Sequence, residues 1–145
     1  MKNEKAAATD VILSIRDPFM QQMIDGEKIY EFRPYRMQSP VVRIWFYRVA
    51  PLSRVEYVCE IEPAVVREDV DPKFSGNGTE TKETNKGKIK PEFAYKILSV
   101  YKLNAPITLV ALKKDHGVGG APQGMVYTPS SILESVEWKC QTRLR

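Results

Sequence analysis

The sequence predicts an α+β domain: a small, mainly antiparallel β-barrel or curled sheet flanked by two or three short helices. A chain of 145 residues and 16.6 kDa is long enough for one hydrophobic core but not for two. About six segments have the alternation or the short apolar runs of β-strands, whereas few have the spacing of amphipathic helices. So few helices cannot provide the repeated crossovers of a parallel α/β sheet, and antiparallel hairpins are therefore expected.

The first half of the chain begins with an apolar run at residues 11–15, which predicts a buried strand. Asp17 and Pro18 then mark the start of a short helix, because a carboxylate can accept from free N–H groups and proline fits the first helical position. Gly26 is placed to end this helix in the left-handed conformation. The apolar face of the helix is formed by Phe19, Met20, Met23 and Ile24.

Three further strands are predicted at residues 28–33, 41–47 and 55–61. The side chains of the first and the last of them alternate with a period of two. Residues 69–90 have almost no apolar side chains, and this composition predicts a long mobile loop. Residues 1–9 are polar and alanine-rich, and we expect a disordered tail there. Residues 10–145 would then form a single domain.

The second half is predicted to open with a helix over residues 91–104, because the apolar residues of this segment recur at helical spacing. That apolar stripe consists of Phe93, Ala94, Ile97, Leu98 and Tyr101. The segments that follow are predicted as a fifth strand, a turn-rich stretch, a sixth strand and a turn or short helical piece, at residues 107–112, 113–124, 125–127 and 129–136.

Composition and charge limit the possible functions. The 22 Lys and Arg residues exceed the 18 Asp and Glu residues, and the pI near 9.0 points weakly to an anionic partner. No apolar run approaches the roughly 20 residues of a spanning helix, and the N-terminus lacks a secretory apolar core, so an intracellular protein without a membrane partner is expected. Cys59 and Cys140 lie far apart and His116 is a lone histidine, so no metal and no cofactor are expected.

The densest group of chemically active side chains lies at residues 26–33, where the predicted helix gives way to a strand. Glu31 and Arg33 share one strand face, so they can pair there and present their polar atoms to a phosphate or a base edge. Strict alternation places Lys28 on the other face, so it can join them only from the turn before the strand or at a bulge. The alternative is an exposed hairpin edge with ordinary salt bridges.

Three short motifs include this cluster: Ser14-Ile15-Arg16-Asp17-Pro18-Phe19, Ile24-Asp25-Gly26-Glu27-Lys28, and Glu31-Phe32-Arg33. In this order and spacing they resemble the signature of the ASCH domain, a branch of the PUA-like superfamily. Residues 44–47 and 58–61 look like the next strands of that family. The resemblance covers residues 11–62 well and the rest of the chain only by the order of its elements.

The resemblance implies a small β-barrel with a cleft beside the first helix, and a function in binding RNA, DNA or a modified nucleobase. Lys28, Glu31 and Arg33 would line the cleft, with Arg16 in the place of the family's first lysine. Arginine keeps the charge at that position but replaces a point donor by a planar fork. Nucleic acid or a modified nucleoside is therefore the expected partner, bound without chemistry.

Two other functions stay open under the resemblance, and whether the chain is an enzyme is undecided. Some short bacterial relatives are amidohydrolases that deacylate N4-acetylcytidine with a lysine, a threonine three residues later and a distant glutamate. Lys28 matches the lysine and would act as base or nucleophile, but Glu31 stands in the threonine position and Glu60 and Glu92 are unranked for the glutamate. Because ASCH domains also occur in coactivators, a protein-interaction module in transcriptional coregulation is the other alternative.

Aromatic and basic side chains beyond the motif complete the candidate site. Trp45 and Tyr47 alternate with their neighbours in the strand, so they are candidates to face the cleft and stack on a base, with core packing as the alternative. Tyr30 and Phe32 lie on the strand face opposite Glu31 and are predicted to be core. The arginines that follow in sequence would form a phosphate-contacting rim or lie scattered on the surface: Arg36, Arg43, Arg48 and Arg54.

Overall fold

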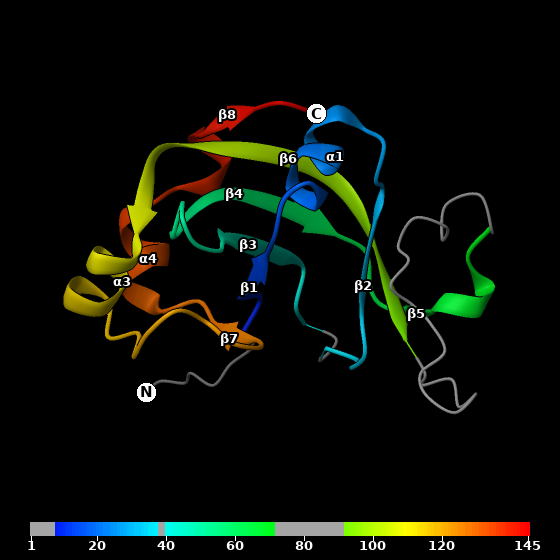
Figure 1. Cartoon of the computed structure of the whole chain (residues 1–145), viewed down its shortest axis with the longest axis horizontal. Coiled ribbons are helices and arrows are strands. Elements are labelled where there is room, and N and C mark those ends of the chain that lie inside the picture. The colour runs from blue at the N-terminus through cyan, green and yellow to red at the C-terminus, as the bar shows by residue number, and fades with distance from the viewer. Residues whose placement is uncertain (1–7, 38–39, 72–91) are drawn as a thin grey trace.

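The chain folds around one curled β-sheet, shown in Figure 1. The computed structural model describes residues 8–37, 40–71 and 92–145, and these residues include eight strands. The strands are β1 (Asp10–Ile15), β2 (Tyr30–Arg33), β3 (Arg43–Arg48), β4 (Arg54–Ile61), β5 (Val65–Val66), β6 (Phe93–Thr108), β7 (Val126–Tyr127) and β8 (Thr142–Arg143).

Six of these strands follow one another across the sheet in the order β2-β6-β4-β3-β1-β7, while β5 and β8 also pair with β6. Strands β1 and β3 are parallel, with Asp10 opposite Arg43 and Ile15 opposite Arg48. The other pairings are antiparallel. The predicted α+β fold with a mainly antiparallel, curled sheet is therefore confirmed.

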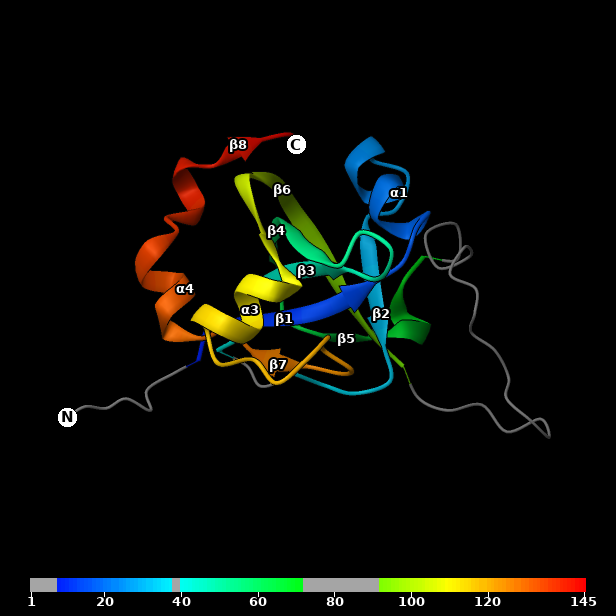
Figure 2. The ribbon, with the colours of Figure 1, turned by 60° about the vertical axis from the view of Figure 1, so that its left-hand side comes forward.

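Short helices lie at the two ends of the sheet. Within the described residues they are α1 (Phe19–Asp25), α3 (Leu109–Asp115) and α4 (Ser130–Ser135), together with the 3-10 turns η1 (Arg67–Asp69) and η3 (Trp138–Cys140). Figures 1 and 2 show α3 and α4 together at one end of the curled sheet and α1 at the other end. The helices thus leave room beside α1, where the chain passes from β1 towards β2.

Two clusters of buried side chains lie on opposite faces of the central strands. In β3, Ile44 and Phe46 pack into the cluster that includes α1, whereas Trp45 and Tyr47 pack into the cluster that includes residues of α3 and α4. All four side chains are at most 1% exposed. Burial of such a side chain stabilises the fold by roughly 1.5–3 kcal/mol, so β3 contributes to both cores.

The predicted strand–helix start of the domain is confirmed, but its helix cap is wrong. Helix α1 begins after Pro18 and ends at Gly26, whose φ of 83° is the expected left-handed stop. No side chain caps its first turn. The carboxylate of Asp17 instead accepts two hydrogen bonds from Arg48, because the end of β3 lies next to the end of β1.

Strand β2 is shorter than predicted. It begins at Tyr30, so Lys28 lies in the turn that joins it to α1. The two-residue side-chain alternation of a strand therefore does not apply to Lys28. This removes the obstacle that strict alternation placed between Lys28 and the pair formed by Glu31 and Arg33.

The predicted helix at residues 91–104 is wrong, because residues 93–108 form the long strand β6. Its buried residues include Ala94, Tyr95 and Ile97, whereas Leu98, which the helical stripe required to be inside, is 49% exposed. The apolar residues of this segment recur at helical spacing by coincidence. The segment is a strand whose pairing with β4 contains two register shifts. Pairing with β2, β4, β5 and β8 determines its conformation, which local sequence does not encode.

The predicted fifth strand at residues 107–112 is also mostly wrong. Its first two residues end β6, and α3 begins at Leu109. The Thr108 hydroxyl accepts a hydrogen bond from the Ala111 N–H at 3.1 Å, which is a helix N-cap. The sixth strand exists as β7, and the predicted helical piece at 129–136 contains α4.

Two predicted segments fall largely outside the part of the chain that the structure describes. They are residues 1–7 of the expected tail and residues 72–90 of the expected mobile loop. Thr9, at the end of the expected tail, is described, and its carbonyl oxygen accepts hydrogen bonds from the backbone of Val42 and Arg43. Val70 is likewise described and is buried.

Candidate ligand-binding pocket

A pocket of about 580 Å³ opens beside α1. Its walls come from the end of β1 and the connection to α1 (residues 14–16 and 19), from the turn and strand around β2 (residues 28 and 31–34), and from Val49. Known small-molecule sites span roughly 300–1,000 Å³, so this pocket is large enough for a small organic ligand.

Glu31 is the central charged group of the pocket. Its Oε2 accepts a hydrogen bond from Arg33 Nε at 2.8 Å, and its Oε1 lies 3.8 Å from Lys28 Nζ. Glu31 is 5% exposed, and burial of a carboxylate without partners would be costly. Two cations on either side offset that cost. We call Lys28, Glu31 and Arg33 the Glu31 cluster.

Arg33 ties two strands together at the pocket. Its Nη2 donates to the carbonyl oxygen of Ser14 at 2.8 Å and lies 2.7 Å from Glu31 Oε2, so it connects β2 with β1. Burial opposes the charged guanidinium, but the Glu31 carboxylate outweighs this effect and raises the pKa of Arg33 above its ordinary value. The predicted pairing of Glu31 with Arg33 on one strand face is confirmed.

Lys28 joins this cluster from the turn before β2. Its side chain is 9% exposed, and its Nζ lies 5.7 Å from the ring centre of Phe19 and 5.2 Å from that of Phe32. Both distances fall within the range of cation–π attraction. The ammonium group is therefore held between a carboxylate and two aromatic rings.

The structure brings four of the six predicted site residues to the same pocket. Arg16, Lys28, Glu31 and Arg33 all line it, with Arg16 on the exposed connection between β1 and α1. The sequence interpretation missed the aromatic walls, because it placed Phe19 on the core face of the helix and Phe32 in the core. The available signal was their position inside the motifs, next to the charged residues.

Trp45 and Tyr47 do not line the pocket, so their predicted place in the cleft is wrong. Trp45 is 0% and Tyr47 1% exposed. The Trp45 indole N–H donates to Asp10 Oδ2 at 2.7 Å, and its ring belongs to the buried cluster that includes residues of α3 and α4. The reason is that β3 lies between two apolar layers, so both of its faces are buried and alternation does not distinguish a cleft face.

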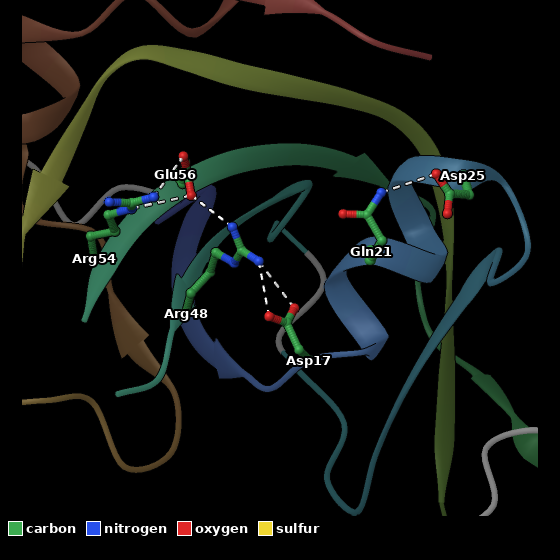
Figure 3. A network of polar contacts seen from close by, with 6 residues as sticks. All are labelled: Asp17, Gln21, Asp25, Arg48, Arg54 and Glu56. Atoms are coloured by element: carbon green, nitrogen blue, oxygen red, sulfur yellow. Dashed lines mark hydrogen bonds and ion pairs between the residues drawn. The ribbon is translucent and has the colours of Figure 1, made fainter. Parts of the chain in front are cut away.

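A second group of charged residues, the Glu56 cluster, consists of Asp17, Arg48, Arg54 and Glu56 (Figure 3). Arg48 uses Nη1 to donate to Glu56 at 2.9 Å and Nη2 to donate to both oxygens of Asp17 at 3.0 and 3.1 Å. Arg54 donates to Glu56 at 3.2 and 3.3 Å. Burial alone would raise the pKa of Glu56, but the hydrogen bonds from Arg48 and Arg54 outweigh it and lower that pKa.

The four arginines therefore do not form the phosphate-contacting rim, which was one of the two alternatives that the sequence left open. Arg48 and Arg54 bond to carboxylates in the Glu56 cluster, and Arg43 donates to Asp10 at 2.9 Å while its guanidinium lies over the ring of Trp138. Arg36 lies over the ring of Phe93. None of the four lines the pocket, where Arg16 is the cation outside the Glu31 cluster.

The cysteines and the histidine lie away from the pocket lining. Cys59 and Cys140 are free thiols, and burial raises the pKa of the Cys59 thiol. His116 Nδ1 lies 2.6 Å from the Ser131 hydroxyl. Among the described residues, no three His, Cys, Asp or Glu side chains gather as a possible metal site.

The curled sheet, the helix beside it and a charged pocket at their junction form an α+β domain. Solved structures of the ASCH protein from Zymomonas mobilis have this fold: one superimposes with a TM-score of 0.68 at 19% sequence identity, covering 88% of this chain and 92% of that one. Two point variants of that protein superimpose similarly, each at 20% identity. The first gives a TM-score of 0.65 and covers 90% of this chain and 98% of its own. The second gives a TM-score of 0.64 and covers 88% of this chain and 95% of its own. The chain therefore has the ASCH fold, as the motifs predicted.

Sequence comparisons add no further relative. No protein-family model matches the chain, and no curated protein matches it either. In the described part of the chain, no helix has both the length and the apolar character needed to cross a membrane.

Proposed function

We propose that the pocket binds a nucleobase, either within an RNA or DNA strand or as a modified nucleoside. The observation that supports this most is the meeting of Arg16, Lys28, Glu31 and Arg33 around one cavity. Among the described residues that line the pocket, three cations stand against one carboxylate, and this excess of positive charge favours a ligand that carries phosphate.

The polar atoms of the Glu31 cluster fit the edge of a base. Glu31 offers carboxylate oxygens that accept from an exocyclic amine or ring N–H, and Lys28 offers an ammonium group that donates to a ring nitrogen or carbonyl. The ammonium nitrogen and the carboxylate oxygen lie 3.8 Å apart, so a donor and an acceptor stand side by side at the pocket.

Phe19 and Phe32 supply the apolar surface that a base requires. Both rings line the pocket and both lie next to Lys28. Stacking of a base on an aromatic ring contributes roughly 1–3 kcal/mol and depends little on the identity of the base. These two rings replace Trp45 and Tyr47 in the proposal.

The same geometry favours binding over amide hydrolysis. A lysine that acts as base or nucleophile must lose its proton, whereas a carboxylate oxygen 3.8 Å away favours the charged ammonium. Neither candidate for the distant glutamate lines the pocket: Glu92 pairs with Arg67, and Glu60 accepts from Ser99. Hydrolysis of an acylated nucleoside is thus the less supported function.

The test compares the wild type with Lys28→Ala and with a control, Lys114→Ala, which removes an exposed lysine of α3 at the other end of the sheet. Each protein is titrated with labelled single-stranded and duplex RNA and DNA at about 50 and about 200 mM salt. We expect salt-sensitive binding by the wild type, a loss of about tenfold or more in Lys28→Ala and little change in Lys114→Ala.

Turnover of N4-acetylcytidine is followed in the same samples. Turnover that disappears in Lys28→Ala would replace the proposal by the amidohydrolase. Absence of both binding and turnover would overturn the proposal and favour a protein-interaction module.

A further inference from the structure

We propose that Arg48 is a positioning residue for the pocket, acting through Asp17. The proposal rests on the proposed function, because the segment that Arg48 holds carries two pocket residues. Arg48 itself does not line the pocket, and its role is to fix the connection between β1 and α1.

The first step is the place of Asp17 in that connection. It stands between Arg16 and Phe19, which both line the pocket. Its side chain is 52% exposed, so burial does not hold it in place. The two bonds from Arg48 Nη2, to both oxygens of its carboxylate, attach the Asp17 side chain to the end of β3.

The second step is the rigidity of Arg48. Its side chain is 15% exposed, and its other arm donates to Glu56, whose side chain is 6% exposed. Glu56 is in turn bonded to Arg54. Arg48 therefore has one arm fixed inside the sheet and the other on the exposed loop, as Figure 3 shows.

The third step is that Arg48 lies beside the pocket in the sheet as well. It stands opposite Ile15 in the β1–β3 pair, and the next residue, Val49, lines the pocket and donates its N–H to the Ile15 carbonyl at 3.1 Å. A shift of Arg48 would thus move pocket residues on both sides of it.

Asp17→Asn tests the proposal, with Asp25→Asn as a matched control. Asp17 lies just before α1, and Asp25 is the exposed last residue of that helix. The Asp25 carboxylate accepts from Gln21 at 3.0 Å (Figure 3). Both variants remove one negative charge. Long-range attraction of RNA would therefore become stronger in both. The positioning role predicts the opposite for Asp17→Asn.

The probe is a labelled single-stranded RNA of mixed sequence. We expect Asp17→Asn to weaken its binding about threefold to fivefold, Asp25→Asn to leave it unchanged or stronger, and Asp17→Glu, which keeps a carboxylate for Arg48, to retain most of the affinity. Tighter binding by Asp17→Asn, equal to that of the control, would overturn the proposal.

Amide hydrogen exchange provides a readout that needs no ligand. The Phe19 N–H donates to the Arg16 carbonyl at 2.9 Å inside this connection. We expect this amide to exchange faster in Asp17→Asn than in the wild type or in Asp25→Asn. Unchanged exchange would overturn the positioning role even if RNA binds. If the wild type binds no RNA, the proposed function fails, and the exchange rate still decides whether Arg48 fixes the connection.

Discussion

The Glu31 cluster and the Glu56 cluster have the same local design and different surroundings. Each has a carboxylate that is 5% exposed, and each places this carboxylate between two basic side chains. In the Glu56 cluster a second carboxylate, Asp17, joins the network, so two arginines meet two acids. At the Glu31 cluster, the described residues that line the pocket include no second acid, and Arg16 adds a further cation.

The difference teaches how to interpret arginines in a basic chain. The arginines around strands β2 to β4 left open a rim that binds phosphate, but three of them, Arg43, Arg48 and Arg54, neutralise carboxylates of the fold. Attraction for an anion depends on the net charge of a cluster, and Lys28 and Arg33 exceed Glu31 by one charge, whereas Arg48 and Arg54 balance Asp17 and Glu56. A buried ion pair by itself does not mark a ligand site.

The largest expected difference between the clusters is in stability. Glu31→Gln removes the carboxylate that the largely buried Lys28 and Arg33 share, and we expect the free energy of unfolding to fall by about 3 kcal/mol. Glu56→Gln should cost about 1–2 kcal/mol, because Arg48 keeps Asp17 and Arg54 is partly exposed. Urea unfolding measures both values, and equal losses would mean that the second carboxylate contributes nothing.

A smaller difference is expected in RNA affinity. Arg16→Gln and Arg54→Gln remove the same charge, but Arg16 lines the pocket and Arg54 is bonded to Glu56. We expect Arg16→Gln to weaken RNA binding about threefold to tenfold and to reduce the slope of log K against log salt by about 1. Arg54→Gln should weaken binding less than about twofold, through long-range attraction alone, and leave the slope nearly unchanged. Equal effects of the two variants would show that only total charge matters.

The smallest expected effect is the pH dependence of the stability that the Glu56 cluster contributes. The folded-state pKa of Glu56 is lowered, so its contribution to stability is present above the unfolded pKa and is lost as the pH falls through the folded pKa. The stability gap between wild type and Glu56→Gln should therefore be widest at pH 7 and narrow below about pH 4.5. Unfolding free energies measured from pH 7 to pH 3 test this, and a constant gap would contradict it.

Local sequence predicted those parts of the molecule whose contacts are local. The spacing predicted that Gly26 ends a helix and that Glu31 and Arg33 lie on one face of the next strand. It started that strand at Lys28, which the structure instead places in the turn. The aromatic walls were missed because Phe19 and Phe32 also fit a core pattern.

Contacts between distant segments could not be predicted. Residues 93–108 have helical spacing of apolar side chains, yet hydrogen bonds to β2, β4, β5 and β8 make them a strand. Trp45 and Tyr47 face away from Ile44 and Phe46, and the second apolar layer, with α3 and α4, buries them. Both errors arise from tertiary pairing that the local pattern does not contain.

The central place of β6 also affects how the protein is made. Strand β2 pairs with β6 in the described chain, with Tyr30 opposite Lys96 and Arg33 opposite Phe93. During synthesis, residues 14–34 and 49 leave the ribosome well before β6, so a nascent chain carries every pocket residue without the partner that holds β2 in place. Contacts so distant in sequence make folding slow. The pocket is thus completed late, and a chain truncated before residue 93 should contain the whole motif and bind nothing.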